Sequence, residues 1–123
     1  MSQYLLVSVV DDDESVRESL PDLLREYGYA AKAFSSSEEF LASVHVEQTK
    51  CVIADIAMPG MSGPDLQKEL KRRQYNIPTI FITAHGTEML RESLMAQGAV
   101  ACLSKPFSDE ALLGALNTAF GGP

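Results

Sequence analysis

The sequence predicts an α/β fold: a flavodoxin-like, doubly wound sheet of five parallel strands with helices on both faces. First, short apolar runs alternate five times with segments of helical periodicity. Second, strands separated by helices cannot form hairpins, so they pair in parallel through right-handed crossovers. Third, the runs CVIAD, TIFIT and VACLS are almost continuously apolar, which is typical of strands covered on both faces.

The two periodicities divide the chain into ten elements. The strands are expected at Leu5–Val10, Ala30–Phe34, Cys51–Ala54, Thr79–Thr83 and Ala99–Leu103. The helices are expected at Glu14–Glu26, Ser37–Val44, Pro64–Gln74, Thr87–Gln97 and Asp109–Phe120. Because 123 residues suit one domain, we expect a single domain over residues 1–120, with residues 121–123 as a tail or the start of a linker.

Capping residues and one proline bear on the helix ends. Asp13 lies just before the first helix, where an aspartate is most often the N-cap. Pro21 should bend that helix or delay its start, because proline lacks the backbone N–H. Gly28 and Gly98 follow helical segments and are expected as C-terminal caps. Ser108 precedes two acidic residues, which is typical of an N-cap and a first helical turn.

Composition and charge exclude several classes of protein. The net charge of −7 disfavours direct nucleic-acid binding by this domain and binding to anionic membranes. No apolar stretch approaches the roughly 20 residues of a membrane span, and the N-terminus lacks the basic region of a signal peptide. Cys51 and Cys102 lie far apart in apolar runs, as expected of buried thiols in a reducing compartment. We therefore expect a cytoplasmic domain.

Polar side chains gather where four of the expected strands end. Three aspartates, Asp11, Asp12 and Asp13, follow the first strand. The third strand ends in Asp55, the fourth in Thr83, and the fifth in Ser104 and Lys105. Because the carboxyl ends of parallel strands share one edge, these groups should meet there. Oxygen ligands select a hard cation, and one or two carboxylates with waters and a phosphate suit Mg²⁺.

Each of these residues also has an ordinary interpretation. Asp13 can be a helix cap, Asp55 a turn residue, Thr83 a strand former and Lys105 a solvated cation. Their coincidence at one edge favours a site. There, Asp55 could attack a phosphorus atom, while Mg²⁺ and Lys105 compensate the negative charge.

Four segments between Val9 and Phe107 resemble the receiver domain of two-component response regulators. They read VVDDDESVR, VIADIAMPGMSG, TIFITAHG and GAVACLSKPF. The run GYAAKAFSSSEEFL and the SKPF segment look most similar to the nitrogen-fixation-regulator type, whose receivers usually precede a DNA-binding domain. The resemblance implies a phosphorylation-dependent signalling switch that takes its phosphoryl group from the phosphohistidine of a sensor histidine kinase. It would alter contacts with an output domain or partner protein, or with a second copy through the fourth and fifth helices.

The resemblance also implies a role for each site residue. Asp55 would accept the phosphoryl group, and Lys105 and Thr83 would contact it. Mg²⁺ would be held by Asp12 and Asp55, by Asp11 through water, and by the backbone carbonyl of Ala57. The bond between Lys105 and Pro106 would be a cis peptide that aims the lysine into the site. Asp13 matches no site position of the family.

Three positions depart from the family pattern or are expected to tune it. Cys102 stands where the family usually has Tyr or Phe, so the usual aromatic rotamer switch is absent from this sequence. Ala57 cannot hold a water molecule, which favours a long-lived phosphoryl group, and His85 could orient water or shield the phosphorus.

The alternatives to a switch are a metal-dependent aspartyl-phosphate phosphohydrolase and a protein-interaction module that is not phosphorylated. Against the first, the candidate nucleophile is on the third strand, and the chain is too short for a substrate cap. Against the second, Asp12, Asp55, Thr83 and Lys105 are all present. We therefore do not expect an enzyme in the usual sense, but a domain that catalyses only its own phosphorylation and dephosphorylation.

Overall fold

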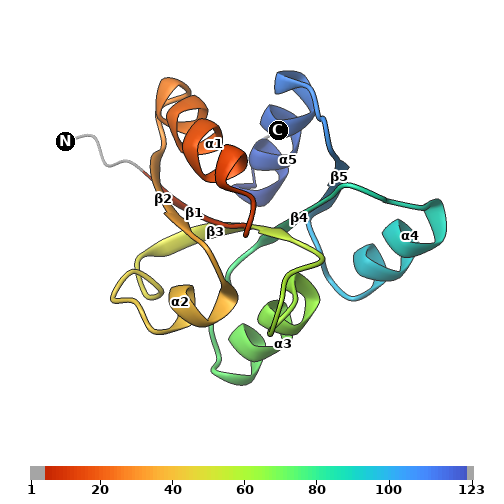
Figure 1. Cartoon of the computed structure of the whole chain (residues 1–123), viewed down its shortest axis with the longest axis horizontal. Coiled ribbons are helices and arrows are strands. Elements are labelled where there is room, and N and C mark those ends of the chain that lie inside the picture. Colours follow the sequence, from red (N-terminus) through yellow and green to blue (C-terminus); the bar gives the residue numbers. More distant parts are fainter. Residues whose placement is uncertain (1–4, 122–123) are drawn as a thin grey trace.

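The strands form one sheet in the order β2-β1-β3-β4-β5, and all neighbouring pairs are parallel (Figure 1). This computed structural model describes residues 5–121, so residues 122 and 123 of the expected tail lie outside the described part. The strands are β1 (Leu6–Val10), β2 (Ala30–Phe34), β3 (Thr49–Asp55), β4 (Thr79–Thr83) and β5 (Ala101–Ser104). The predicted flavodoxin-like parallel fold is confirmed.

Helices cover both faces of the sheet (Figure 1). They are α1 (Glu14–Glu26), α2 (Ser37–Leu41), α3 (Gly63–Arg72), α4 (Glu88–Ala96) and α5 (Asp109–Ala119). Leu24 of α1 and Leu112 of α5 belong to one apolar core. Phe40 of α2, Leu66 of α3 and Leu94 of α4 belong to the core on the other face. The sheet is therefore covered as the continuous apolar runs predict.

Strand register brings the polar strand ends to one edge. Asp11 directly follows β1, Asp55 ends β3, Thr83 ends β4 and Lys105 directly follows β5. Asp55 is paired in register with Ile82, the neighbour of Thr83. These groups are far apart in sequence, and the parallel sheet places them together as expected.

The start of α1 corrects one expectation. The helix runs from Glu14 to Glu26 without interruption, so the delayed start expected from Pro21 is wrong. Pro21 lacks the backbone N–H that would have donated to the carbonyl of Arg17. Its ring is buried, and the helix continues past it. The Asp13 side chain accepts a hydrogen bond from the N–H of Ser15 at 2.9 Å, which confirms its role as N-cap.

Helix α2 is shorter than expected, since it ends at Leu41 rather than Val44. The hydroxyl of Ser43 donates to the carbonyl of Phe40 at 2.8 Å and accepts from the N–H of His45 at 3.2 Å. These local bonds replace those of a further helical turn.

Three strand starts also differ, and β1 begins at Leu6 rather than Leu5. β3 begins earlier than expected at Thr49, whose hydroxyl lies 2.7 Å from that of Ser8 in the core. β5 begins later, at Ala101, because the N–H of Ala99 donates to the carbonyl of Leu94 at 3.1 Å and so closes α4.

The ends of the remaining helices shift by one or two residues. Helix α3 ends at Arg72, and Gln74 has a left-handed φ of 67° that stops the helix before its expected end. Thr87 and Gln97 are the caps of α4 rather than its first and last residues. Ser108 is the N-cap of α5, as expected.

Three further expectations can be compared with the fold. Gly28 and Gly98 follow α1 and α4 with φ values of 95° and 103°, as C-terminal caps require. Cys51 and Cys102 are buried free thiols, and burial raises the pKa of Cys51 to about 12. Among residues 5–121, no helix is long and apolar enough to span a bilayer.

Candidate functional site

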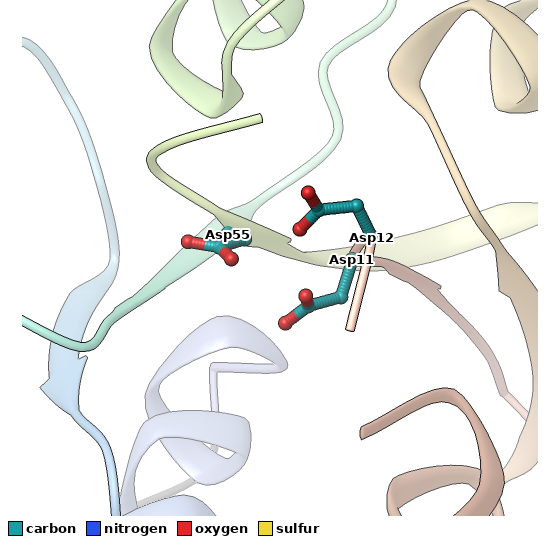
Figure 2. Close-up of side chains that lie close together, drawn as sticks. All are labelled: Asp11, Asp12 and Asp55. Atoms are coloured by element: carbon teal, nitrogen blue, oxygen red, sulfur yellow. The ribbon is translucent and has the colours of Figure 1, made fainter. Parts of the chain in front are cut away.

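Three carboxylates converge where β1 and β3 end (Figure 2). Asp11, Asp12 and Asp55 each offer one oxygen, and these oxygens all lie within 4.8 Å of one another. Asp11 and Asp55 are buried, whereas Asp12 is exposed. The cluster predicted from the sequence is therefore assembled by the fold.

Each polar atom of Asp11 has either a hydrogen-bond partner or an ion-pair partner. Its N–H donates to the carbonyl of Phe34 at 3.1 Å, and its Oδ1 accepts from the N–H of Asp13 at 2.8 Å. Its carbonyl accepts from Nη1 of Arg17 at 3.0 Å. Its fully buried Oδ2 lies 3.0 Å from the ammonium of Lys105. The residue is thus fixed in place.

Burial raises the pKa of Asp11, and the charge of Asp55 raises it further. The N–H of Asp13 and the ammonium of Lys105 act in the opposite direction, but burial outweighs them. An ionised Asp11 would therefore gain from an additional cation.

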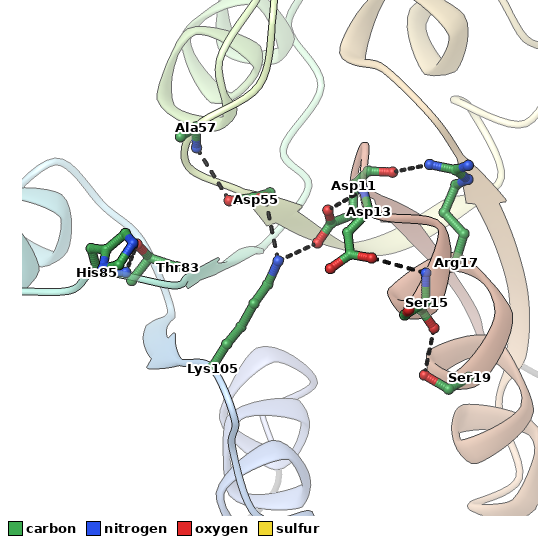
Figure 3. A network of polar contacts seen from close by, with 10 residues as sticks. All are labelled: Asp11, Asp13, Ser15, Arg17, Ser19, Asp55, Ala57, Thr83, His85 and Lys105. Atoms are coloured by element: carbon green, nitrogen blue, oxygen red, sulfur yellow. Dashed lines mark hydrogen bonds and ion pairs between the residues drawn. The ribbon is translucent and has the colours of Figure 1, made fainter.

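Lys105 joins the two buried carboxylates (Figure 3). Its Nζ lies 3.0 Å from Oδ2 of Asp11 and 3.3 Å from Oδ2 of Asp55. Burial would lower the pKa of Lys105, but the carboxylates of Asp11 and Asp55 outweigh burial and raise the pKa. The side chain is therefore a stable cation. Its backbone N–H donates to the carbonyl of Thr83 at 2.7 Å, and its bond to Pro106 is cis, as expected.

Asp55 is enclosed by the start of α3. Its Oδ1 accepts from the N–H of Ala57 at 3.2 Å, which bends the chain directly after the strand. A Cβ atom added at Gly63 would lie 2.4 Å from the carbonyl oxygen of Asp55, so only glycine fits there. Gly63 is the first residue of α3 and packs against the Asp55 backbone.

Thr83 lies at the same edge, and its buried hydroxyl accepts from the backbone N–H of His85 at 3.1 Å (Figure 3). This bond holds the hydroxyl at the start of the loop that leads to α4. His85 is exposed. The structure thus brings the threonine to the site edge, with its hydroxyl bonded to the loop rather than to Asp55.

Cys102 borders a cavity between α4, β5 and α5. The cavity has a volume of about 320 Å³, and its lining includes Arg91, Leu103, Phe107 and Ala111. Burial raises the pKa of the Cys102 thiol, so the group is a small apolar side chain here. A hollow therefore lies beside the Cys102 thiol.

The carboxylate cluster fits a hard divalent cation such as Mg²⁺. All its side-chain donors are oxygens. The buried Oδ2 of Asp11 has no hydrogen-bond partner, and its neighbour is the Lys105 ammonium. An exposed third carboxylate, Asp12, leaves one side of the cluster open to solvent.

Sequence reasoning missed two residues that hold this site. Arg17 binds the Asp11 carbonyl, and it could have been found because helical side chains point back toward the N-terminus of their helix. Glu38 of α2 accepts from the N–H of Met61 at 2.9 Å and so ties down the loop after Asp55. That contact joins segments 23 residues apart, so no local sequence pattern predicts it.

Known proteins resemble this chain over nearly its whole length. Residues 7–117 match the family described as response regulator receiver domain. Nodulation protein W of Bradyrhizobium diazoefficiens is 46% identical over 115 residues, which are 94% of this chain and 51% of that protein. The transcriptional regulatory protein FixJ of Azorhizobium caulinodans is 39% identical over 121 residues, which are 98% of this chain and 57% of that protein. The chain thus spans about half the length of these curated relatives.

Solved structures agree with these relatives. The crystal structure of FixJ-N has a TM-score of 0.82 and 38% identity, and the match covers 97% of this chain and 94% of that one. The chemotaxis protein CheY4 of Vibrio cholerae has a TM-score of 0.83 and 28% identity, with 95% and 99% covered.

Proposed function

Because the chain belongs to the response regulator receiver domain family, we propose that Asp55 is its phosphoryl acceptor in a phosphorylation-dependent switch of a two-component system. One observation carries the assignment: the carboxylate of Asp55 lies 3.3 Å from a lysine ammonium and clusters with two further aspartates. A carboxylate that attacks a phosphorus atom needs positive charge to offset the phosphoryl oxygens, and the two further aspartates would hold a cation that adds to it.

In the proposed transfer, an oxygen of Asp55 forms a bond to phosphorus. The phosphorus–nitrogen bond of a kinase phosphohistidine breaks, and its electron pair stays on the imidazole. Lys105 neutralises the phosphoryl oxygens, and its contact with Asp11 keeps the ammonium in place meanwhile. Mg²⁺ would be held by Asp12, Asp55 and the carbonyl of Ala57, with Asp11 acting through water. When bound, this ion compensates negative charge on the phosphoryl group.

The response would start at Thr83. Its hydroxyl, now bonded to the N–H of His85, would turn to the phosphoryl oxygen and release that loop. Cys102 is too small to repeat the ring movement of an aromatic residue, so the loop and α4 would carry the signal. We propose that α4 and α5 then change their contacts with an output domain, a partner or a second copy.

The lifetime of the phosphoryl group would depend on Ala57 and His85. Ala57 places a methyl group two residues after the acceptor, where no polar atom can orient an attacking water. His85 is exposed above Thr83 and would shield the phosphorus or orient water. We propose slow loss of the phosphoryl group. A sensor histidine kinase would deliver the phosphoryl group to Asp55 in the cytoplasm. We therefore propose that the domain acts in that compartment.

Intact-mass measurement tests the acceptor. Incubation with acetyl phosphate and Mg²⁺ should add one base-labile phosphoryl group, and a chelator added beforehand should prevent it. Asp55→Asn should abolish the addition, because an amide is not a competent nucleophile. Asp13→Asn is the matched control: it removes one neighbouring carboxylate that caps α1, and it should be labelled almost normally. An unmodified wild type, or normal labelling of Asp55→Asn, would refute the proposal.

A further inference from the structure

Arg17 reaches the site from the first turns of α1. Its Nη1 donates to the carbonyl of Asp11 at 3.0 Å, and the side chain is half-buried (Figure 3). That carbonyl belongs to the peptide unit that joins Asp11 to Asp12. The guanidinium therefore fixes the plane of the peptide that carries two of the three clustered carboxylates.

Asp11 and Asp12 depend on this peptide to different degrees. Both carboxylate oxygens of Asp11 have neighbours of their own, the N–H of Asp13 and the ammonium of Lys105. The carboxylate of Asp12 is exposed, and within residues 5–121 it forms neither a hydrogen bond nor an ion pair with a side chain or backbone group. Its direction is therefore set by the backbone on which it stands.

We infer that Arg17 is a positioning residue for the divalent cation: by holding the Asp11–Asp12 peptide, it aims Asp12 at the cluster. The inference rests on the metal site of the proposed function. Groups that orient metal ligands from outside typically contribute about 10- to 100-fold to metal affinity.

The charge of Arg17 makes the inference sharply testable. A guanidinium near a divalent cation repels it, so if Arg17 acted only by its charge, removing it would tighten Mg²⁺ binding. If Arg17 acts by positioning, removing it loosens the binding. The two explanations predict opposite signs for the same variant.

Calorimetric Mg²⁺ titration of the unphosphorylated protein should show about tenfold weaker binding for Arg17→Ala. Arg17→Lys keeps the charge and one donor but loses the planar fork, and it should fall between wild type and Arg17→Ala. Arg25→Ala is the matched control. Arg25 lies on the same helix and also donates to a backbone carbonyl, that of Ala31 at 2.9 Å, so its loss removes the same charge and kind of bond away from the site.

A second readout separates positioning from general damage. With acetyl phosphate as donor, the Mg²⁺ concentration that gives half the maximal labelling rate should rise about tenfold in Arg17→Ala. The rate at saturating Mg²⁺ should stay within about twofold, because Asp55 and Lys105 are unchanged.

The outcomes distinguish the two levels of the argument. Unchanged or tighter Mg²⁺ binding in Arg17→Ala, or an equal loss in Arg25→Ala, overturns the positioning role while the metal site stands. A wild type that binds no Mg²⁺ overturns the metal site, and this inference with it. If Arg17→Ala does not fold, the Mg²⁺ affinity of Arg17→Lys tests the inference instead. An affinity equal to that of wild type would then overturn the positioning role.

Discussion

The carboxyl-terminal edge of the sheet has two parts that differ in how firmly they are held: one where β1 and β3 end, and one where β4 and β5 adjoin α4. At the first, Asp11 has a partner at each of its polar groups, and Lys105 joins it to Asp55. At the second, α4 is nine residues long, Leu94 is its one buried residue and Met89 is 81% exposed. We call the first part the rigid edge, because its groups are firmly held, and the second the α4 edge, because its helix is lightly attached.

The difference matches two separate requirements. Phosphoryl transfer depends on charges held in a fixed geometry, because misplaced groups stabilise the transition state poorly. An element that changes position with phosphorylation must instead lie near the low end of local stability. Thr83 stands between the two, since it ends a fully buried strand and its hydroxyl holds the loop toward α4.

The largest effect is expected from Lys105→Ala. The ammonium is the nearest described cation to the Asp55 carboxylate, and removing such a group typically lowers a rate by about 100- to 1,000-fold. The initial rate of labelling by acetyl phosphate at saturating Mg²⁺ measures this loss. Lys68→Ala, on the exposed side of α3, removes the same charge and should be labelled normally. Equal rates for the two variants would contradict the rigid edge as the source of catalysis.

Gly63→Ala should weaken the same edge through packing. A Cβ there would lie 2.4 Å from the Asp55 carbonyl oxygen and 3.1 Å from its carbonyl carbon, so backbone must move. We expect the free energy of unfolding to fall by up to about 3 kcal/mol, as measured by denaturant titration. Gly114 of α5 has no atom within 4 Å of such a Cβ. Gly114→Ala should therefore add about 0.5–1 kcal/mol through helix propensity.

Asp12→Ala should separate metal binding from folding. At Mg²⁺ a hundredfold above its dissociation constant, the wild type should gain about 2.7 kcal/mol of stability by linkage, and the variant none. Without Mg²⁺ the variant should be as stable as the wild type or slightly more so, because an exposed carboxylate among like charges is removed. Thermal unfolding with and without Mg²⁺ measures both. An equal gain in the variant would exclude Asp12 as a ligand.

The rigid edge could be predicted further from the sequence than the lightly attached one. Each of its main residues follows or ends a strongly apolar run: Asp11, Asp12, Asp55 and Lys105. A parallel sheet must place the carboxyl ends of such strands at one edge. Asp13 carried a local capping signal and is the N-cap. By contrast, how firmly α4 is attached depends on which of its apolar residues find a partner. Met89 and Leu94 look alike in sequence, yet one is exposed and the other buried.

The sequence also could not reveal contacts that depend on tertiary structure. Glu38 meets the N–H of Met61 because α2 and the loop after β3 adjoin in space. The early end of α2 depends on Ser43, because its hydroxyl forms local bonds that compete with a further helical turn. The presence of a serine does not by itself predict that these bonds form. Pro21 shows the reverse, since its strong local signal is overridden by packing in α1.

Thr83→Ala tests the connection between the edges. The variant should still be labelled, but the amide shifts of residues 85–104 on adding beryllofluoride should shrink by about half or more, because no hydroxyl remains to bond the phosphoryl group. Cys102→Ala should change those shifts little. A normal response in Thr83→Ala with a large loss in Cys102→Ala would reverse the proposed order of the two residues.

The smallest effect is expected at Met89. Its side chain is 81% exposed on α4, so Met89→Lys removes almost no buried apolar surface and keeps a residue with good helix propensity. The free energy of unfolding of the unphosphorylated domain should therefore stay within about 0.5 kcal/mol of wild type. If α4 forms contacts only after phosphorylation, the same variant should weaken self-association or partner binding of the phosphorylated form, measured by sedimentation. A stability loss above about 1 kcal/mol would mean that α4 is packed more firmly than its exposure indicates, and the contrast between the two edges would fail.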